Sequence, residues 1–196
     1  EATPEELSES QNLFRQWVLA LDMQSRSLRR LQEIRNINQG RELEAQSWQG
    51  FDVKPPYSLA LVEDLRDAVA NETLEAETDR VLVSISEKSI DREAARLTEA
   101  FKQQRLARDE AEVESQTNQR RQWLARLAEV RVQSDEAILE AFETARLVSL
   151  EKLSGLRQYI KFLERKLASA QAKAGFSEAD LESVLARLTK GRDEVR

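Results

Sequence analysis

The sequence predicts an all-α protein, an elongated antiparallel coiled-coil bundle of three long helices followed by a short C-terminal helix. The first observation behind this prediction is composition. Of 196 residues, 34% are charged, and only 5 are Gly and 3 are Pro. Residues that interrupt helices are therefore scarce. The second observation is that apolar residues recur every seven positions, the spacing at which helices coil around one another. We expect a single extended domain over residues 1–196.

The first helix is expected at about 4–46. Thr3 can cap its first turn, Pro4 suits the first helical position, and Glu6 completes a capping box. A seven-residue repeat then forms a narrow apolar seam, which a partner helix must cover. The repeat consists of Leu7, Phe14, Leu21 and Leu28, and the residues that fill the same side are Trp17, Val18, Leu31, Ile34 and Ile37.

A loop rich in aromatic residues and proline is expected at 47–57. Consecutive prolines cannot continue a helix, so the chain must turn here, and Ser58 can cap the next helix. The loop suggests a stiff surface for a protein partner. The simpler alternative is that its rings cap the open end of the bundle. The candidate residues for partner contact are Trp48, Phe51, Pro55, Pro56 and Tyr57.

The second helix is expected at about 58–115. Its seven-residue row is Val62, Val69, Ala76, Val83, Ile90 and Leu97, supported by Leu65, Ala94 and Phe101. Polar residues interrupt the companion row in the middle of the helix, at Thr73, Arg80 and Glu87, which suggests local flexibility there. The apolar rhythm lapses near 114–118. We expect the chain to turn back at this point, because an uncovered seam has nowhere to bury itself.

The third helix is expected at about 118–174, with Trp123 in its seam as Trp17 is in the first. Its last part carries regular heptads, Leu153, Ile160, Leu167 and Ala174, interleaved with Leu156, Leu163 and Ala170. Gly175 fits a helix C-cap. A fourth helix is expected at about 178–195, where Ser177 and Asp180 form an acidic variant of the capping box.

Residue content argues against an enzyme. The chain has no Cys and no His, so cysteine nucleophiles, thiolate metal ligands and the commonest general acid/base are all missing. Carboxylates are plentiful, but we expect the Glu pairs to face water rather than a desolvated cleft. No calcium-loop spacing and no glycine-rich phosphate loop occurs. We therefore predict no catalytic residues, no metal site and no cofactor.

The charge pattern bears on partners. The 30 basic and 36 acidic side chains give a net charge of −6 and are interleaved along the chain. A nucleic-acid-binding surface needs clustered Lys and Arg, so nucleic acid is not expected. No apolar run reaches the roughly 18 residues that would suggest a membrane span. Protein partners, or self-association through the coiled-coil seams, remain as the expected interactions.

Two short blocks carry a family resemblance. The first runs from Trp48 through Pro55, Pro56 and Tyr57 to Arg66, and the second runs through 176–188. Together they resemble the amino-terminal extracytoplasmic helical region of large bacterial proteins in the small-conductance mechanosensitive channel family. The resemblance implies a periplasmic domain that precedes the membrane helices of an inner-membrane channel. Those membrane helices and the pore helix do not occur in these residues, so no pore residue carries over.

Two functions remain open at this stage. The first is a non-catalytic periplasmic coiled-coil domain that regulates or scaffolds a mechanosensitive ion channel, with membrane contact only through a parent chain. The second is a stand-alone coiled-coil adaptor of the cell envelope or cytoplasm. The sequence begins with Glu1 rather than Met, and we expect it to start within a longer product or after a removed signal peptide.

Overall fold

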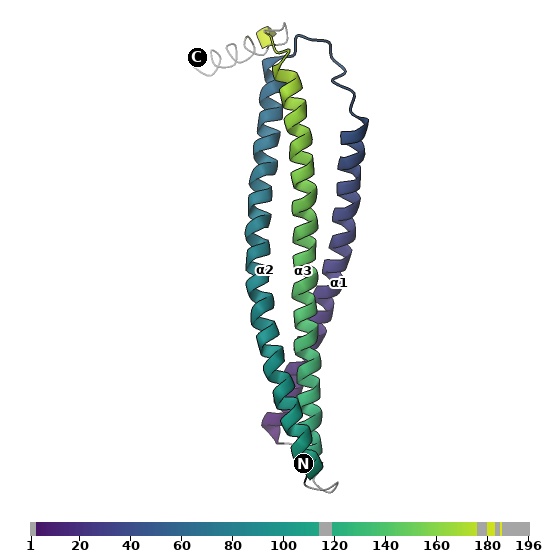
Figure 1. The fold of residues 1–196 in the computed structure, drawn as a ribbon, viewed down its shortest axis with the longest axis vertical. Helices are drawn as coiled ribbons and strands as arrows, with labels where there is room; N and C mark the ends of the chain where they lie inside the picture. The colour runs from purple at the N-terminus through teal and green to yellow at the C-terminus, as the bar shows by residue number, and fades with distance from the viewer. Residues whose placement is uncertain (1–2, 114–118, 176–179, 183–184, 186–196) are drawn as a thin grey trace, which may run out of the picture. The chain divides into compact units, whose positions relative to one another are not determined.

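The computed structural model describes residues 3–113, 119–175, 180–182 and 185. Figure 1 shows its three long helices, and the all-α prediction is confirmed. Their bounds are Pro4–Ser47 for α1, Leu59–Val113 for α2 and Gln119–Gln171 for α3. The predicted ends lie within a few residues of these bounds, the usual uncertainty at helix termini.

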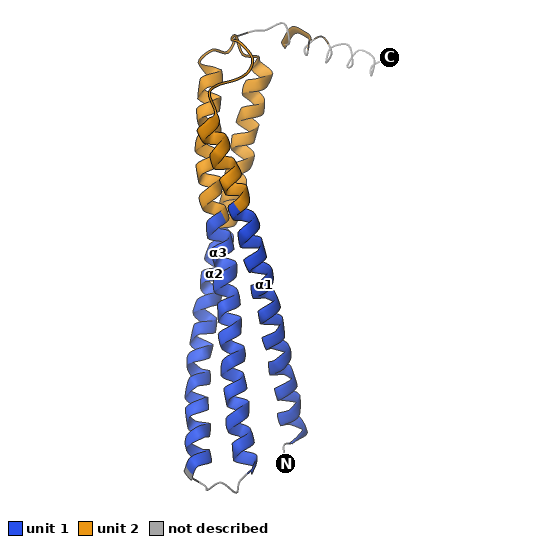
Figure 2. Ribbon diagram, turned by 90° about the vertical axis from the view of Figure 1, so that its right-hand side faces the viewer, with its two compact units in different colours: residues 1–35, 80–151 blue, residues 36–79, 152–196 orange. Residues whose placement is uncertain are grey.

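The contacts of the chain group it into two compact units, coloured separately in Figure 2. Unit 1 comprises residues 1–35 and 80–151, and unit 2 comprises residues 36–79 and 152–196. Each long helix contributes a segment to both units. The expectation of one domain over 1–196 stays a prediction.

Ion pairs between helices establish the helix directions in unit 1. They are Glu6–Arg120, Glu9–Arg131, Arg35–Glu151, Arg96–Asp135 and Glu87–Arg146. Residue numbers on α1 and α3 rise together, so these helices are parallel, whereas numbers on α2 fall as those on α3 rise. The chain therefore reverses between the end of α2 and the start of α3, as predicted, although residues 114–118 lie outside the described part.

The predicted N-caps of α1 and α2 are both confirmed. The Thr3 N–H donates to Glu6 Oε2 at 2.7 Å, and the Glu6 N–H donates to Thr3 Oγ1 at 3.3 Å. At α2, the Leu61 N–H donates to Ser58 Oγ at 3.2 Å. These bonds satisfy amides that have no partner inside the first turn of a helix.

The core of unit 2 is apolar and dense around α3. The regular heptads at the end of α3 supply four of its eight buried apolar residues, because a 3.5-residue repeat keeps one side turned toward the neighbouring helices. Gly155 lets α3 lie close to α1, since a β-carbon at this position would overlap the side chain of Asn38 on α1. The buried apolar residues of unit 2 are Tyr57, Val62, Leu65, Leu153, Leu156, Phe162, Leu163 and Ala170.

The core of unit 1 combines large aliphatic side chains with a cluster of alanines. Ala20 of α1 packs against Ala137 and Ala141 of α3, and Trp17 and Ile138 lie at the edge of this cluster. Small side chains let two helix backbones approach, but each buries little apolar area. Trp17 and Trp123 are half-buried, so the prediction that both lie in the seams is confirmed only in part.

The end of α3 differs from the prediction. The helix stops at Gln171, so Gly175 lies beyond it and does not act as its C-cap. Gly175 instead donates its N–H to the Tyr57 carbonyl at 3.1 Å, and its missing β-carbon leaves room for Pro56. Of the predicted fourth helix, the described residues 180–182 and 185 are helical, while Ser177 lies outside the described residues.

Candidate interaction surfaces

The rings of the loop between α1 and α2 turn toward the bundle. Trp48 meets Phe51 edge-on at a centroid distance of 5.6 Å and Phe162 of α3 at 5.9 Å. Phe51 in turn meets Tyr57 at 4.9 Å. Tyr57 is only 6% exposed and belongs to an apolar cluster with Val62, Leu65 and Ala170. These edge-to-face contacts are favourable beyond the area they bury.

Backbone and carboxylate contacts hold the same loop against the chain beyond α3. The Tyr57 N–H donates to the Lys173 carbonyl at 3.0 Å, and the Tyr57 carbonyl accepts the bond from Gly175 described above. Asp180, which is buried, accepts from the amides of Leu59 and Ala60 at 2.9 and 3.4 Å. A negative carboxylate at this position stabilises α2, because the N-terminus of a helix is the positive end of its dipole. Residues 121 positions apart thus fix the start of one helix.

The five residues predicted to contact a partner divide into two groups. Trp48, Phe51 and Tyr57 are half-buried or buried and use their ring faces within unit 2, an arrangement that fits the end-capping alternative. Pro55 and Pro56 are exposed and are joined by a cis peptide bond. Contact of the loop with a partner stays a prediction, and it now concerns the exposed stretch 52–56 rather than the rings.

The main departure from the sequence prediction lies on α1. Its seven-residue row was expected to be covered within the bundle, but Leu7, Phe14, Leu21 and Leu28 are 46–54% exposed. We call these four residues the α1 row. The inner face of α1 is supplied instead by Leu13, Ala20, Leu31 and Ile34. Only the last two of these were predicted, because the structure uses a helix face about a quarter-turn away from the row.

The α1 row continues on one side with further exposed apolar surface and is flanked by charge. Val18, four residues after Phe14, is 64% exposed. Arg15 and Asp22 are exposed and follow Phe14 and Leu21 by one position each. An apolar stripe edged by charges of both signs is typical of the contact face of a coiled coil.

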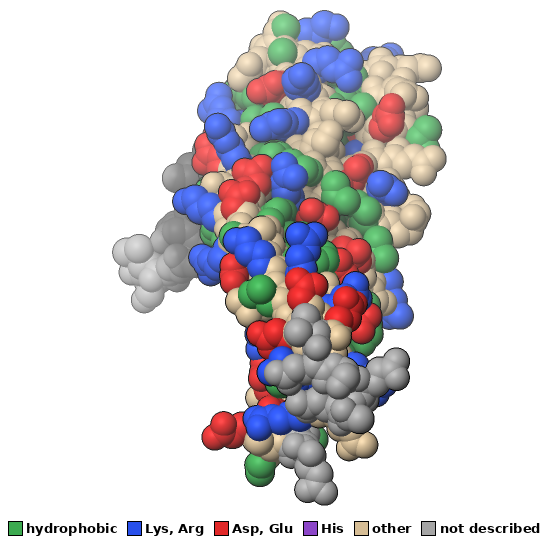
Figure 3. All heavy atoms as spheres, turned by 60° about the horizontal axis from the view of Figure 1, so that its bottom comes forward, with side chains coloured by type: hydrophobic (Ala, Val, Ile, Leu, Met, Phe, Trp, Pro, Cys, Tyr) green, Lys and Arg blue, Asp and Glu red, His purple; other side chains and the backbone are tan. Residues whose placement is uncertain are grey.

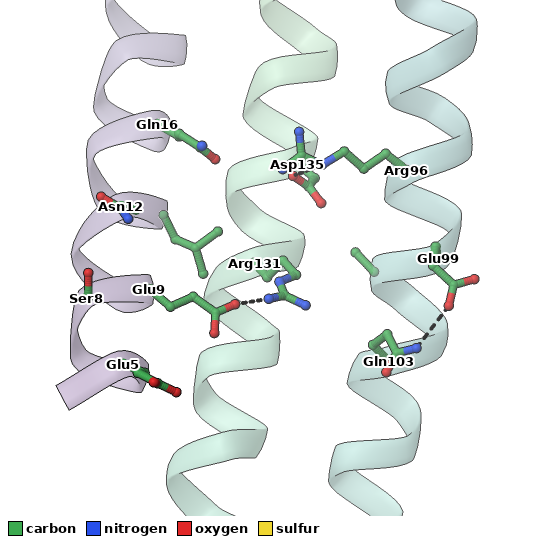
Figure 4. A pocket seen from close by; sticks show the side chains of 12 residues that line it. Glu5, Ser8, Glu9, Asn12, Gln16, Arg96, Glu99, Gln103, Arg131 and Asp135 are labelled. Carbon is green, nitrogen blue, oxygen red and sulfur yellow. Dashed lines mark hydrogen bonds and ion pairs between the residues drawn. The ribbon is translucent and has the colours of Figure 1, made fainter. Parts of the chain in front are cut away.

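A polar cleft of about 580 Å³ opens between the three helices of unit 1. Figure 4 shows its side chains reaching inward from all three helices. An ion pair between Glu9 and Arg131 crosses it from α1 to α3, and Ser134 Oγ donates to the Leu13 carbonyl at 3.3 Å beside it. The charged residues of the lining are Glu5, Glu9, Arg96, Glu99, Arg131 and Asp135.

Asp135 is the most enclosed charged group of this cleft. The residue is 1% exposed, its Oδ1 accepts no hydrogen bond, and Arg96 Nε lies 3.4 Å away in an ion pair. Burial raises the pKa of the Asp135 carboxyl, against the opposing effect of Arg96, and nearby Glu93 raises it further. A buried carboxylate with incomplete partners destabilises its surroundings but can fix the register of packed helices.

Unit 2 holds a second buried carboxylate, that of Asp79, which is 4% exposed and forms an ion pair with Lys152. Lys152 Nζ of α3 lies 2.7 Å from Glu75 Oε1 and 2.8 Å from Asp79 Oδ2, both on α2. Burial lowers the pKa of Lys152, but its hydrogen bonds to Asp79 and Glu75 outweigh this effect and raise the pKa overall. The hydrogen bond from Lys152 also lowers the pKa of Glu75. The pairing thus favours the ionised form of both groups.

Sequence reasoning did not single out Asp79 or Asp135. A signal for Asp135 exists: the apolar spacing of α3 runs through Leu127, Val130 and Ile138, and the positions four and three before Ile138 are the polar residues Ser134 and Asp135. For Asp79 the signal was the polar interruption in the middle of α2. A polar interruption of the apolar spacing predicts a buried ion pair only when the helix that lies opposite is known.

The surface elsewhere has mixed charge. Figure 3 shows Lys and Arg interspersed with Asp and Glu over the face it presents. Among the described residues, no group of three or more Asp or Glu could hold a metal ion, and no helix is long and apolar enough to cross a membrane.

The chain was compared with protein-family models, curated proteins and solved structures, and none of them matches it.

Proposed function

We propose that this chain is a non-catalytic helical bundle that works by binding another protein chain through the α1 row. The observation that carries the proposal is the exposure of four large apolar residues at strict seven-residue spacing on one preformed helix. Scattered exposed apolar residues are normal in soluble proteins, but a regular row along one helix is the pattern that a partner helix covers.

The charges around the row support a protein partner over other classes. Arg15, Asp22 and Arg29 alternate in sign along one edge of the row. A membrane surface or nucleic acid would favour Lys and Arg throughout such an edge. A protein helix can match both signs.

A photo-crosslinking experiment in cells tests this proposal. A photoreactive phenylalanine replaces Phe14, and in a second strain it replaces Phe101, which lies on α2 of the same unit and is equally exposed, at 45% against 46%. We expect discrete adducts of defined higher mass from position 14 and none from position 101. Equal labelling at the two positions, or no adduct from position 14, would contradict an interface on the α1 row.

We further propose that this bundle belongs to a mechanosensitive channel of the bacterial inner membrane, as a periplasmic domain that scaffolds or regulates it. Support comes from the two blocks of family resemblance, which contact each other: Asp180 of the second block accepts from Leu59 and Ala60 of the first. A contact between them gives a reason for the two blocks to occur together. Long helices also transmit displacement over tens of ångströms.

Reading the parent gene tests the channel setting. Several apolar stretches of about 20 residues after residue 196 would support it, and their absence would favour the alternative, a stand-alone coiled-coil adaptor. If the channel is present, deleting residues 1–196 should change its gating tension or its assembly. Unchanged gating and assembly would overturn the regulatory role and leave binding by the α1 row to be judged separately.

A further inference from the structure

The α1 row has the residue order of a coiled-coil seam as well as its spacing. Four positions after each of its first three members come Gln11, Val18 and Ser25, so the row and this companion row alternate by four and three residues. Phe14, Val18 and Leu21 form an uninterrupted apolar stretch at the centre of the seam, and polar residues lie toward both ends. A partner helix therefore gains most by packing against residues 14–21.

We propose that the occupant of the α1 row is the α1 helix of a second copy of this chain, packed antiparallel to the first. This inference rests on the proposed function, since it names the partner of the same surface. In the antiparallel register, Val18 of each copy packs against Leu21 of the other. A two-fold axis then crosses the seam between these residues, and the same surface serves both copies.

Charge complementarity selects the antiparallel direction. With Val18 opposite Leu21 of the second copy, Arg15 of each chain comes close to Asp22 of the other, which makes two symmetric ion pairs. In a parallel, in-register pair the corresponding neighbours of Arg15 and Asp22 are Ser10 and Trp17, and neither carries a charge. Asp22 now pairs with Arg26 within its own helix, at 2.6 Å and largely in water, so changing partner costs little.

The dimensions fit a modest, reversible dimer. The seam from Leu7 to Leu28 is about 32 Å long at roughly 1.5 Å per residue. An isolated helix pair of this length would be marginal, but α1 is already formed within the bundle and does not pay for helix formation on association. Gln11 and Ser25 weaken the seam near its ends, as polar residues at such positions do while they specify register.

Light-scattering mass over a concentration series gives the first test. We expect the mass to rise from the monomer value of 22.5 kDa toward twice that value. Arg15→Asp and Asp22→Arg should each weaken the dimer about tenfold, because both symmetric pairs become repulsive, and the double variant should restore it. Arg108→Asp, at an exposed position on α2, serves as the matched control and should leave the mass unchanged.

Oxidative cross-linking tests the direction, and the absence of cysteine makes each introduced thiol unique. In the proposed register position 11 lies opposite position 28 of the second copy. A tagged Gln11→Cys variant mixed with an untagged Leu28→Cys variant should therefore give mixed dimers, and neither variant alone should cross-link efficiently. Self-cross-linking of Gln11→Cys would overturn the antiparallel arrangement.

The two proposals fail in different ways. A mass that stays at the monomer value, with no cross-linked dimer, overturns the second copy as occupant. If position 14 still gives adducts in cells under those conditions, the α1 row binds a different protein and the proposed function stands. If position 14 gives none either, both proposals fall.

Discussion

The two units of this chain use the same three helices in different ways. In unit 2 the interior is filled by large apolar side chains, among them Leu156 and Phe162, each 1% exposed. Unit 1 also buries large aliphatic side chains, such as Leu13 and Leu127, but one of its core clusters consists of three alanines, and its groups at 0–1% exposure include the polar residues Ser134 and Asp135. Both units leave some large apolar side chains exposed, but in unit 1 four of them form the regular α1 row.

Buried apolar side chains stabilise the fold, whereas exposed ones are available to bind a partner. Burial of large apolar side chains is the main favourable contribution to folding, so truncating a buried ring of unit 2 should lower the stability more than changing a polar group in the interior of unit 1. Part of the interior of unit 1 is small or polar, and the four large apolar residues of the α1 row lie outside its core, where a partner can cover them. The following three predictions test this contrast, beginning with the largest expected effect.

Phe162→Ala should lower the free energy of unfolding by about 3 to 5 kcal/mol, the usual range for a fully buried Phe. The Phe162 ring lies 5.9 Å from the ring of Trp48 in the loop and 6.0 Å from that of Tyr159 on α3, measured between ring centroids. Urea unfolding followed by far-UV circular dichroism measures the effect.

Phe101→Ala provides the matched control in unit 1. The same atoms are removed from a ring that is 45% exposed, so the loss should be about 1 kcal/mol or less. Equal losses for the two variants would contradict the assignment of the dense core to unit 2.

Lys152→Met should lower the free energy of unfolding by about 2 kcal/mol, measured in the same way. The change removes the cation that faces Glu75 and Asp79 and leaves the buried Asp79 carboxylate without it. Leaving one member of a buried pair uncompensated costs up to about 5 kcal/mol, and the value here is smaller because Lys152 is partly exposed.

Removing both partners sharpens this prediction. The double variant Lys152→Met/Asp79→Leu should recover most of the loss, since replacing both members of a buried pair with apolar groups is often nearly neutral. Lys161→Met, at an exposed position on the same helix, is the control and should change little. A double variant as unstable as the single one would mean that packing, not charge, accounts for the loss.

The fold was largely predictable from the sequence, for physical reasons. Helix starts were found at Thr3 and Ser58 because capping depends on a few adjacent residues. The buried heptads at Leu153, Leu156 and Leu163 were found because a regular repeat identifies its own inner face. The prediction was wrong where the cause is distant: Gly175 does not cap α3 and instead bonds to Tyr57, which precedes it by more than a hundred residues.

The candidate surfaces were less predictable. The same seven-residue repeat on α1 that predicted a buried seam turned out to mark an exposed one, because a repeat shows that a face needs cover but not which chain provides it. The buried position of Asp135 depends on where α1 and α2 approach α3, which spacing along one helix does not reveal.

Asp135→Asn should change the free energy of unfolding least of the three substitutions, by about 1 kcal/mol. At neutral pH the variant should be the more stable protein. The carboxyl is buried with one oxygen that accepts no hydrogen bond, and removing its charge lowers the penalty for burying it. Arg96 keeps its ion pair with Glu93 at 3.7 Å in the variant, so the Arg96 charge still has a partner.

The pH dependence follows from the direction of the pKa shift. Burial raises the pKa of Asp135 in the folded chain, so the folded state holds the proton to higher pH than the unfolded state does. Stability from this group therefore falls as pH rises from the unfolded pKa through the folded one. The advantage of Asp135→Asn over the wild type should grow from about pH 4 to about pH 7 in urea unfolding. Asp91→Asn, at an exposed position on α2, should show no such trend, and a trend in the opposite direction for Asp135→Asn would mean that its pairing with Arg96 outweighs burial.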